Sequence, residues 1–302
     1  MQENKTQMDQ GTKLLVLGFA GMLVAYFVAK GAGFYMKSIG VDDTISTLMV
    51  TIIRSIVAVV IFVALGGGSW IRPSWKSVRE TWSFAFGLII INLIMGVSIA
   101  ASVLLGVMEE TIAFQTFIQM GAYATILCLL VGINEEVMFR GLVLGGLLAK
   151  MGGTKDGILK AAIISSVIFG AWHVIFDMNY SNIYSIGSGI MKTVETALFA
   201  FILCVPIIRG KNLWGAILAH AFFDWILLCG NTIQNGGMTT PAYAFENPAI
   251  AMAAIGIFTL MTVLYLPFAI RAYKKLKEVE APQFGPFVKE GQPAEELEEQ
   301  PA

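Results

Sequence analysis

The sequence is poor in charged residues and has almost no excess of either sign. Charged residues make up 14% of the 302 positions, against about 25% in soluble globular proteins. The 20 Lys and Arg are balanced by 21 Asp and Glu, and 56% of the residues are hydrophobic, with a mean hydropathy of +0.73. This composition excludes a water-soluble enzyme, and the absence of a basic excess argues against nucleic acid as a partner.

Cysteine is equally scarce. The three cysteines, Cys128, Cys204 and Cys229, lie inside apolar runs and lack the short spacings of zinc-binding motifs. They therefore predict neither a disulfide framework nor a structural zinc site. We expect each of them to be a small apolar residue of the core.

Long apolar segments make up most of the chain. A transmembrane helix needs about 20 mostly apolar residues. Segments that reach this length are 14–36, 45–65, 82–107, 113–149, 158–177, 186–208, 213–229 and 248–270. The fourth is too long for one crossing, so we expect it either to begin with an interfacial turn near Thr111–Met120 or to extend past the bilayer. The predicted fold class is all-α, a polytopic membrane bundle of about eight transmembrane helices.

Lys and Arg are distributed unevenly between the connecting segments. Fifteen of the 20 lie in the N-terminal arm, in every second loop or in the C-terminal segment, whereas the opposite loops together contain only Lys37. Lys and Arg concentrate in cytoplasmic loops of membrane proteins. The pattern predicts an integral protein of the cytoplasmic membrane, surrounded by membrane lipids, with both termini in the cytoplasm.

The C-terminal segment differs in composition from the rest. Prolines at 282, 286 and 293 are followed by four glutamates within 295–299. Such a segment cannot bury a core. We therefore predict an integral membrane domain over residues 1–278 and a disordered acidic tail over 279–302.

Ionisable residues inside apolar segments are expensive and predict function. Here they gather in short motifs of the fourth, fifth and seventh segments, and the two histidines of these motifs are the only ones in the protein. The candidate site residues are Glu135, Glu136, Arg140, Phe169, His173, His220 and Asp224.

Helical spacing predicts which of these side chains meet. Glu136 and Arg140 are four residues apart with the carboxylate first, the favourable order for an ion pair. Glu135 points about 100° away around the helix, so one glutamate can pair with the arginine while the other faces a cavity. His220 and Asp224 are also four apart, and they could bond to each other or line one pocket.

The fourth and fifth segments form a hairpin with its turn near Thr154. Glu135 lies 19 residues before that position and His173 19 after it, so the two reach the same height in an antiparallel pair. Phe169, one turn before His173, is expected to wall one side of the imidazole. His220 lies only about nine residues past the preceding basic turn. Glu135, His173 and His220 reach the same height only if the hairpin of the fourth and fifth segments protrudes into the cytosol by several residues. This geometry predicts a site near the cytoplasmic membrane face.

Carboxylate and imidazole groups at one level can activate water for attack on a carbonyl. A second imidazole, with an amide or carboxyl group, can stabilise the oxyanion. Alternatively, Glu135, His173 and His220 could bind zinc, because catalytic zinc commonly keeps three protein ligands and an open position. The HExxH signature is absent, and no serine or cysteine lies in an evident nucleophile motif.

Two interpretations in which the protein is not a hydrolase also fit these residues. The groups could be a buried ion pair with two packed histidines. A proton-coupled transporter also needs buried carboxylates and histidines, although the chain lacks the repeats and matched broken helices of many transporters.

The ordered motifs read Glu135-Glu136-x-x-x-Arg140, Phe169-x-x-x-His173 and His220-x-x-x-Asp224. Together they resemble the motifs of the CAAX-processing and bacteriocin-processing (CPBP, or Abi) intramembrane protease family. The resemblance covers about residues 115–230. It is supported by Phe139-Arg140-Gly141 and by the run Asn212-Leu213-Trp214 before the third motif.

The resemblance implies a peptidase that cleaves a peptide or lipidated protein within the membrane. Relatives include the endopeptidase that removes the last three residues of prenylated CAAX proteins, while others process bacteriocins, confer immunity to them or act as scaffolds. By this resemblance Glu135 is the general base, His173 its partner, and His220 with Asp224 the oxyanion or substrate side. The family's third motif usually ends in Asn, so Asp224 departs from it.

The same resemblance assigns Glu136 and Arg140 to a supporting pair, although the two adjacent glutamates could exchange roles. Family members are often called metalloproteases. Zinc therefore stays an open cofactor, with Glu135, His173 and His220 as its ligands. The alternative function is that of a non-proteolytic membrane scaffold or a bacteriocin immunity protein, in which the same residues are structural. The motifs leave the substrate and the oligomeric state open.

Overall fold

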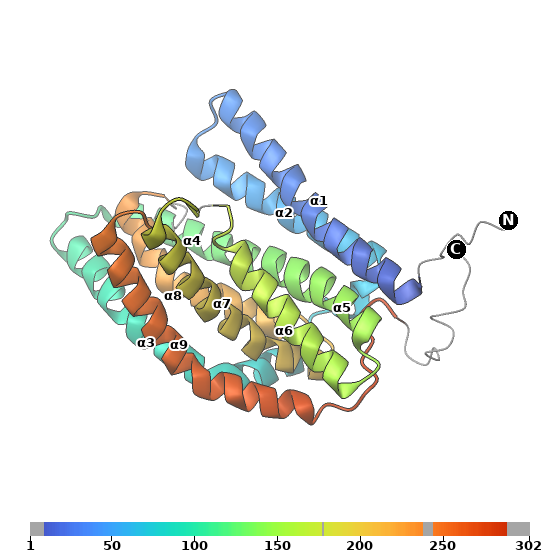
Figure 1. Ribbon diagram of the computed structural model, residues 1–302. Coiled ribbons are helices and arrows are strands. Elements are labelled where there is room, and N and C mark those ends of the chain that lie inside the picture. The colour runs from blue at the N-terminus through green and yellow to red at the C-terminus, as the bar shows by residue number, and fades with distance from the viewer. Residues whose placement is uncertain (1–8, 177, 238–243, 289–302) are drawn as a thin grey trace.

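The computed structural model describes residues 9–176, 178–237 and 244–288, and this part of the chain is helical without strands (Figure 1). The helices are α1 (Gln10–Ser38), α2 (Asp43–Ala64), α3 (Trp75–Met108), α4 (Phe114–Glu135), the π-helix η2 (Glu136–Val143), α5 (Leu144–Met151), α6 (Lys155–Trp172), α7 (Ile183–Gly210), α8 (Trp214–Asn235) and α9 (Pro248–Lys277). A short 3₁₀ turn, η1 (Gly67–Ser69), follows α2. The predicted all-α bundle is confirmed.

Within the described residues, seven helical segments are long and apolar enough to cross a membrane. They are α1, α2, α3, the continuous rod of α4, η2 and α5, and α7, α8 and α9. The protein is thus an integral membrane protein. The remaining helix, α6, has 18 residues with Lys155, Asp156 and Lys160 in its first two turns, and it ends before the predicted limit at 177.

The fourth predicted segment is a single rod, Phe114–Met151. It contains no interfacial turn, because α4 is helical from Phe114 onward. Its 38 residues span about 57 Å at 1.5 Å per residue, which exceeds the roughly 30 Å of a hydrocarbon core. The segment is thus one helix that is longer than the hydrocarbon core is thick, and its extension past the bilayer stays a prediction.

The helices alternate between two ends of the bundle. At one end, Asp9 before α1 lies 2.6 Å from Lys150 of α5, and the backbone N–H of Leu213 donates to the carbonyl of Trp70. We call this the basic end; it comprises residues 9–13, 65–80, 150–160, 209–213 and 271–288. At the other end, the segments after α6 and before α9 are joined by hydrogen bonds. This alternation groups the loops as the basic residues predicted.

Residues 279–288 pack against the bundle, although the sequence placed them in a disordered tail. The N–H of Gln283 donates to the carbonyl of Gly152, and the Phe287 ring lies 5.8 Å from that of Phe62. Burial of this aromatic anchor against the core explains why order extends beyond residue 278. The rest of the predicted tail, 289–302, lies outside the described residues.

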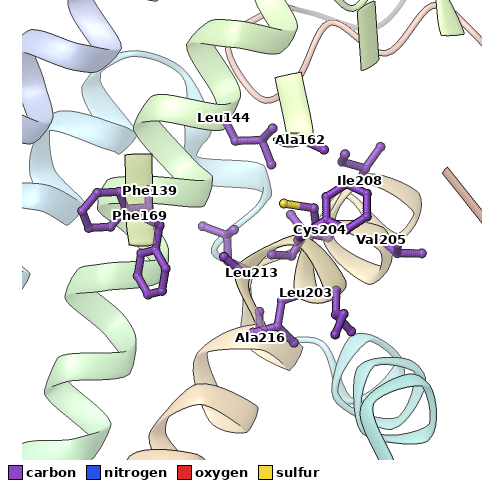
Figure 2. Packing of buried hydrophobic residues seen from close by; sticks show 14 of the residues in the cluster. Phe139, Leu144, Ala162, Phe169, Leu203, Cys204, Val205, Ile208, Leu213 and Ala216 are labelled. Carbon is purple, nitrogen blue, oxygen red and sulfur yellow. The ribbon is translucent and has the colours of Figure 1, made fainter. Parts of the chain in front are cut away.

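The main hydrophobic core surrounds η2 and α5. Every residue from Glu136 to Ala149 is buried, and Figure 2 shows the packing of Leu144 with residues of α6, α7 and α8. The three cysteines are free and buried, as expected. This packed region holds the polar groups of η2 in place.

Candidate active site

Two glycines set how closely the site helices approach. A Cβ on Gly132 of α4 would lie 2.6 Å from the carbonyl oxygen of Ile217 in α8, and one on Gly170 of α6 would meet the backbone of α7. Only glycine allows such contact between helix backbones. Gly132 lies one turn before Glu135, and Ile217 lies one turn before His220. The contact therefore brings the first and third motifs together.

Glu136 opens the π-helix η2, and Arg140 lies within it. Single π-helical turns inside α-helical rods occur frequently at functional sites. Glu136 Oε1 lies 3.2 Å from Arg140 Nη1, and the two side chains are 0% and 1% exposed. The ion pair expected from the spacing is therefore present, and it is fully buried.

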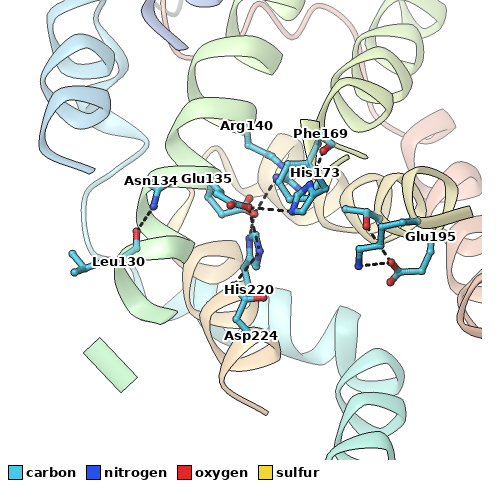
Figure 3. A network of polar contacts seen from close by, with 12 residues as sticks. Leu130, Asn134, Glu135, Arg140, Phe169, His173, Glu195, His220 and Asp224 are labelled. Atoms are coloured by element: carbon cyan, nitrogen blue, oxygen red, sulfur yellow. Dashed lines mark hydrogen bonds and ion pairs between the residues drawn. The ribbon is translucent and has the colours of Figure 1, made fainter. Parts of the chain in front are cut away.

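His220 is held by the second glutamate. Its Nδ1 lies 2.7 Å from Glu136 Oε1, which also pairs with Arg140. An ionised carboxylate only accepts hydrogen bonds, so His220 donates from Nδ1. Its Nε2 then faces Glu135 Oε2 and Asp224 Oδ2, at 3.7 Å from each (Figure 3). Because 3.7 Å is too long for a hydrogen bond, His220 and Asp224 line one pocket without bonding directly.

His173 lies at the C-cap of α6, at the end of the helix. Its Nδ1 is 2.8 Å from the carbonyl oxygen of Phe169. Because a carbonyl oxygen only accepts, Nδ1 carries the proton and Nε2 faces Glu135 Oε2 at 3.7 Å. The Phe169 ring lies edge-on to the imidazole with centroids 4.6 Å apart, so it forms the expected wall. The Arg140 guanidinium lies 3.9 Å from the same ring centroid.

Glu135 is the glutamate that faces both histidines. Its side chain is 19% exposed, and its Oε2 is buried without a hydrogen bond to any described residue. The two imidazole Nε2 atoms approach this oxygen from α6 and α8. A carboxylate oxygen and two ring nitrogens thus converge on one point, which suits a hydrogen-bond donor such as water.

A cavity of about 90 Å³ lies beside these groups. His173, His220 and Asp224 line one side of it, while Asn92 of α3 and Tyr265 of α9 contribute to the rest. About 10–15 Å³ is enough for one water, so this cavity has room for several. The histidines of two motifs therefore share a small polar chamber within the bundle.

Sequence reasoning missed part of this chamber. Lys192 and Glu195 of α7 line it, joined at 2.8 Å. Their i, i+3 spacing in the sequence is compatible with this pair, but spacing along one helix does not place the pair at the site. Asn92 donates to the hydroxyl of Tyr265 at 3.1 Å. A lone asparagine inside the apolar run of α3 was the available signal for this part of the wall.

The three side chains left open as zinc ligands, Glu135, His173 and His220, do converge. Among the described residues, however, no group of three or more His, Cys, Asp or Glu side chains is arranged to hold a metal ion. As placed, these residues do not form a three-ligand metal centre.

Comparison with known proteins identifies the segment that contains these motifs. Residues 117–226 match the family model of type II CAAX prenyl endopeptidase Rce1-like proteins. The matched segment covers about a third of the chain, includes every residue from Glu135 to Asp224, and agrees with the predicted range of 115–230. Neither curated proteins nor solved structures gave a match. This segment is therefore similar to type II CAAX prenyl endopeptidase Rce1-like proteins, in agreement with the resemblance drawn from the three motifs.

Proposed function

We propose that the protein is a CAAX-type intramembrane endopeptidase that hydrolyses a peptide bond with water activated by Glu135 and His173. The observation that supports this function is the convergence of Glu135 Oε2 with the Nε2 atoms of His173 and His220 beside the polar cavity. The family match supports the same reaction class.

Water activation follows from the spacing of these atoms. A water about 2.8 Å from both Glu135 Oε2 and His173 Nε2 fits their 3.7 Å separation. As its oxygen attacks the peptide carbonyl, its proton passes to Glu135. Glu135 then delivers that proton to the leaving amine, so the carboxylate is regenerated as the peptide bond breaks. His173 orients the water, because its Nδ1 proton is fixed on the Phe169 carbonyl.

His220 is the proposed donor to the tetrahedral oxyanion. Since Glu136 holds the proton on Nδ1, His220 can donate from Nε2 only as an imidazolium. Glu136, itself held by Arg140, orients the ring as a buried carboxylate orients a catalytic histidine. Asp224 lies on the substrate side. Its carboxyl group helps an oxyanion only when protonated, because a carboxylate would repel the developing charge.

The proposed site lies near the cytoplasmic face. His220 is six residues, about 9 Å, into α8, whereas Glu135 is sixteen residues, about 24 Å, from the end of its rod at Met151. The α5–α6 turn therefore extends about 15 Å farther than the α7–α8 turn. The basic residues at this end favour the cytoplasm for both termini, and a peptide or lipidated protein would enter from there.

The test uses a synthetic farnesylated peptide that ends in a CAAX sequence, with the protein in liposomes. Mass spectrometry should detect release of the C-terminal tripeptide by the wild type. Glu135→Gln and His173→Ala should each lower the rate by about 10²–10⁴ and leave the unfolding temperature unchanged. Glu109→Gln, an exposed carboxylate after α3, is the matched control.

Two results would change the proposal. If folded Glu135→Gln keeps full activity while an equally stable Glu136→Gln loses its activity, the roles assigned to the two glutamates are reversed. If the wild type cleaves neither this peptide nor any membrane protein, the peptidase function is rejected. Cleavage of membrane proteins is checked by mass spectrometry. This experiment compares the membrane peptides of cells that contain the wild type with those of cells that contain Glu135→Gln.

A further inference from the structure

A second cavity lies at the basic end, away from the candidate active site. It has a volume of about 630 Å³ and lies between α3, α7 and α9. Its lining contains four cations, Lys76, Arg79, Arg209 and Arg271, and one carboxylate, Glu80. None of its lining residues belongs to the active-site cavity. It is therefore a separate feature of the molecule.

The charges of this cavity favour an anion. Lys76 and Glu80 form an exposed pair at 3.9 Å, so the three arginines supply the excess positive charge. Glu278 interacts with Arg209 but is bonded to Lys275 at 2.7 Å. Guanidinium groups present planar pairs of N–H donors that match phosphate oxygens. Three of them, from three helices, line this one cavity and make it cationic.

The neighbouring aromatic residues place the pocket at the level of lipid headgroups. Trp75, beside Lys76 at the start of α3, is 79% exposed, and Tyr273, two residues after Arg271, is also exposed. Trp and Tyr are enriched at membrane–water interfaces. On the membrane side of the pocket, Phe86 of α3 and Ile270 of α9 expose apolar side chains. The cations thus adjoin a surface that suits acyl chains.

We propose that this pocket binds the phosphate headgroup of an anionic phospholipid. The arginines contact the phosphate, while the acyl chains lie along the apolar surfaces of α3 and α9. The Arg271 guanidinium is already held 4.9 Å from the Phe84 ring centroid, which preorganises it. A headgroup here would join the ends of three helices, all of which also contribute residues to the active-site cavity.

The experiment is native mass spectrometry of the delipidated full-length protein, titrated with dioleoyl-phosphatidylglycerol or dioleoyl-phosphatidylcholine. We expect tighter binding of phosphatidylglycerol. Arg209→Gln with Arg271→Gln should weaken it about 30-fold, at about fivefold for each charge removed near a lipid surface. Arg79→Gln alone should weaken it about fivefold. All three arginines are exposed, so the unfolding temperatures should match the wild type.

Lys155→Gln with Lys160→Gln is the matched control, because both lysines are exposed at the same end and outside the pocket. This control should bind phosphatidylglycerol like the wild type. Equal weakening by the control, or equal binding of phosphatidylcholine, would overturn the proposal. Displacement of the lipid by inorganic phosphate at the same concentration would overturn a lipid ligand in favour of free phosphate.

Discussion

Glu136 Oε1 lies 2.7 Å from His220 Nδ1, although the two residues are 84 positions apart in the chain. The second glutamate of the first motif therefore holds the histidine of the third. Its neighbour Glu135 faces both histidines with a carboxylate oxygen that accepts no hydrogen bond from the part of the chain that the structure describes. The two adjacent carboxylates thus have different roles. Glu136 positions the imidazole ring of His220, whereas Glu135 faces the two histidines that line the cavity.

Glu136→Gln should destabilise the protein as well as inactivate it. The change removes the partner of fully buried Arg140, and breaking a buried pair from one side costs about 3–5 kcal/mol. Denaturant unfolding in detergent, followed by tryptophan fluorescence, measures this loss.

A double variant separates stability from activity. Glu136→Gln with Arg140→Met removes both charges, and replacing a buried pair by apolar groups is often neutral for stability. We expect recovery of most of the unfolding free energy but not of peptide cleavage, because His220 still lacks its carboxylate. Wild-type stability in the single variant would contradict the role given to the pair.

Asp224→Asn should retain most of the activity or raise it. Asn keeps one carbonyl acceptor and adds an NH₂ donor, which can bond an oxyanion near His220 Nε2. The measurement is cleavage of the farnesylated peptide by the wild type and by the variant, each with and without a chelator. An inactive variant restored by added zinc would instead make Asp224 a metal ligand.

Gly132→Val should separate α4 from α8 and reduce cleavage. Its side chain would overlap the carbonyl of Ile217, and overpacking of this kind typically costs about 1–3 kcal/mol. Gly31→Val is the matched control, because a Cβ at Gly31 in α1 meets nothing within 4 Å. If both variants cleave the peptide at the wild-type rate, the glycine contact does not set the site geometry.

The contact between Asp9 and Lys150 should depend on pH. The hydrogen bond from Lys150, followed by those from Thr12, holds the pKa of Asp9 well below its usual range. Because the pKa of Asp9 is lower in the folded state than in the unfolded state, its ionised carboxylate stabilises the folded protein at pH values above the unfolded pKa of about 3.9. This stabilisation is lost as the pH falls toward the folded pKa. Asp9→Asn keeps an acceptor for the Thr12 N–H but removes the charge.

We therefore expect Asp9→Asn to be less stable by about 0.2–1 kcal/mol above about pH 5, the range for exposed pairs. The difference should shrink as the pH falls below about 4. Unfolding temperatures of both proteins, measured across this range, give the result. A difference that grows on acidification would show that the pair is not its source.

Fusion reporters test the orientation. A reporter after Glu280 and one at Thr154 should both read cytoplasmic, since both positions lie at the basic end, whereas one at Gly236 should read outside. An external signal at Thr154 with a cytoplasmic one at Gly236 would invert the bundle and the access to the site.

Hydropathy and spacing predicted much of this molecule because they record local properties. Apolar runs located the membrane helices, and the i, i+4 spacing predicted the pair of Glu136 and Arg140. The end of α6 at Trp172 was not predicted, because an apolar stretch, Val174–Phe176, continues beyond His173. Local polarity therefore gave no sign that the helix stops there.

Contacts between distant segments were beyond these arguments. Spacing pairs His220 with Asp224, but the observed bond joins it to Glu136, because the approach of α4 and α8 through Gly132 decides which side chain is nearest. The position of Lys192 on the cavity wall likewise depends on how α7 packs against its neighbours. Such relationships arise from tertiary packing, which the periodicity of one helix does not encode.

The π-helix η2 gives its rod one residue more than an α-helix of the same height holds, because a π-helix closes its backbone bonds over five residues instead of four. Loss of one residue here would let the rod close as a regular α-helix without turning α5 relative to α4. Gly146 of α5 would then still lie against the backbone of Leu15 in α1, and Glu135 would keep its place. Deletion of Val137 should therefore preserve the docking of α1 but change the spacing of Glu136 and Arg140 from four residues to three.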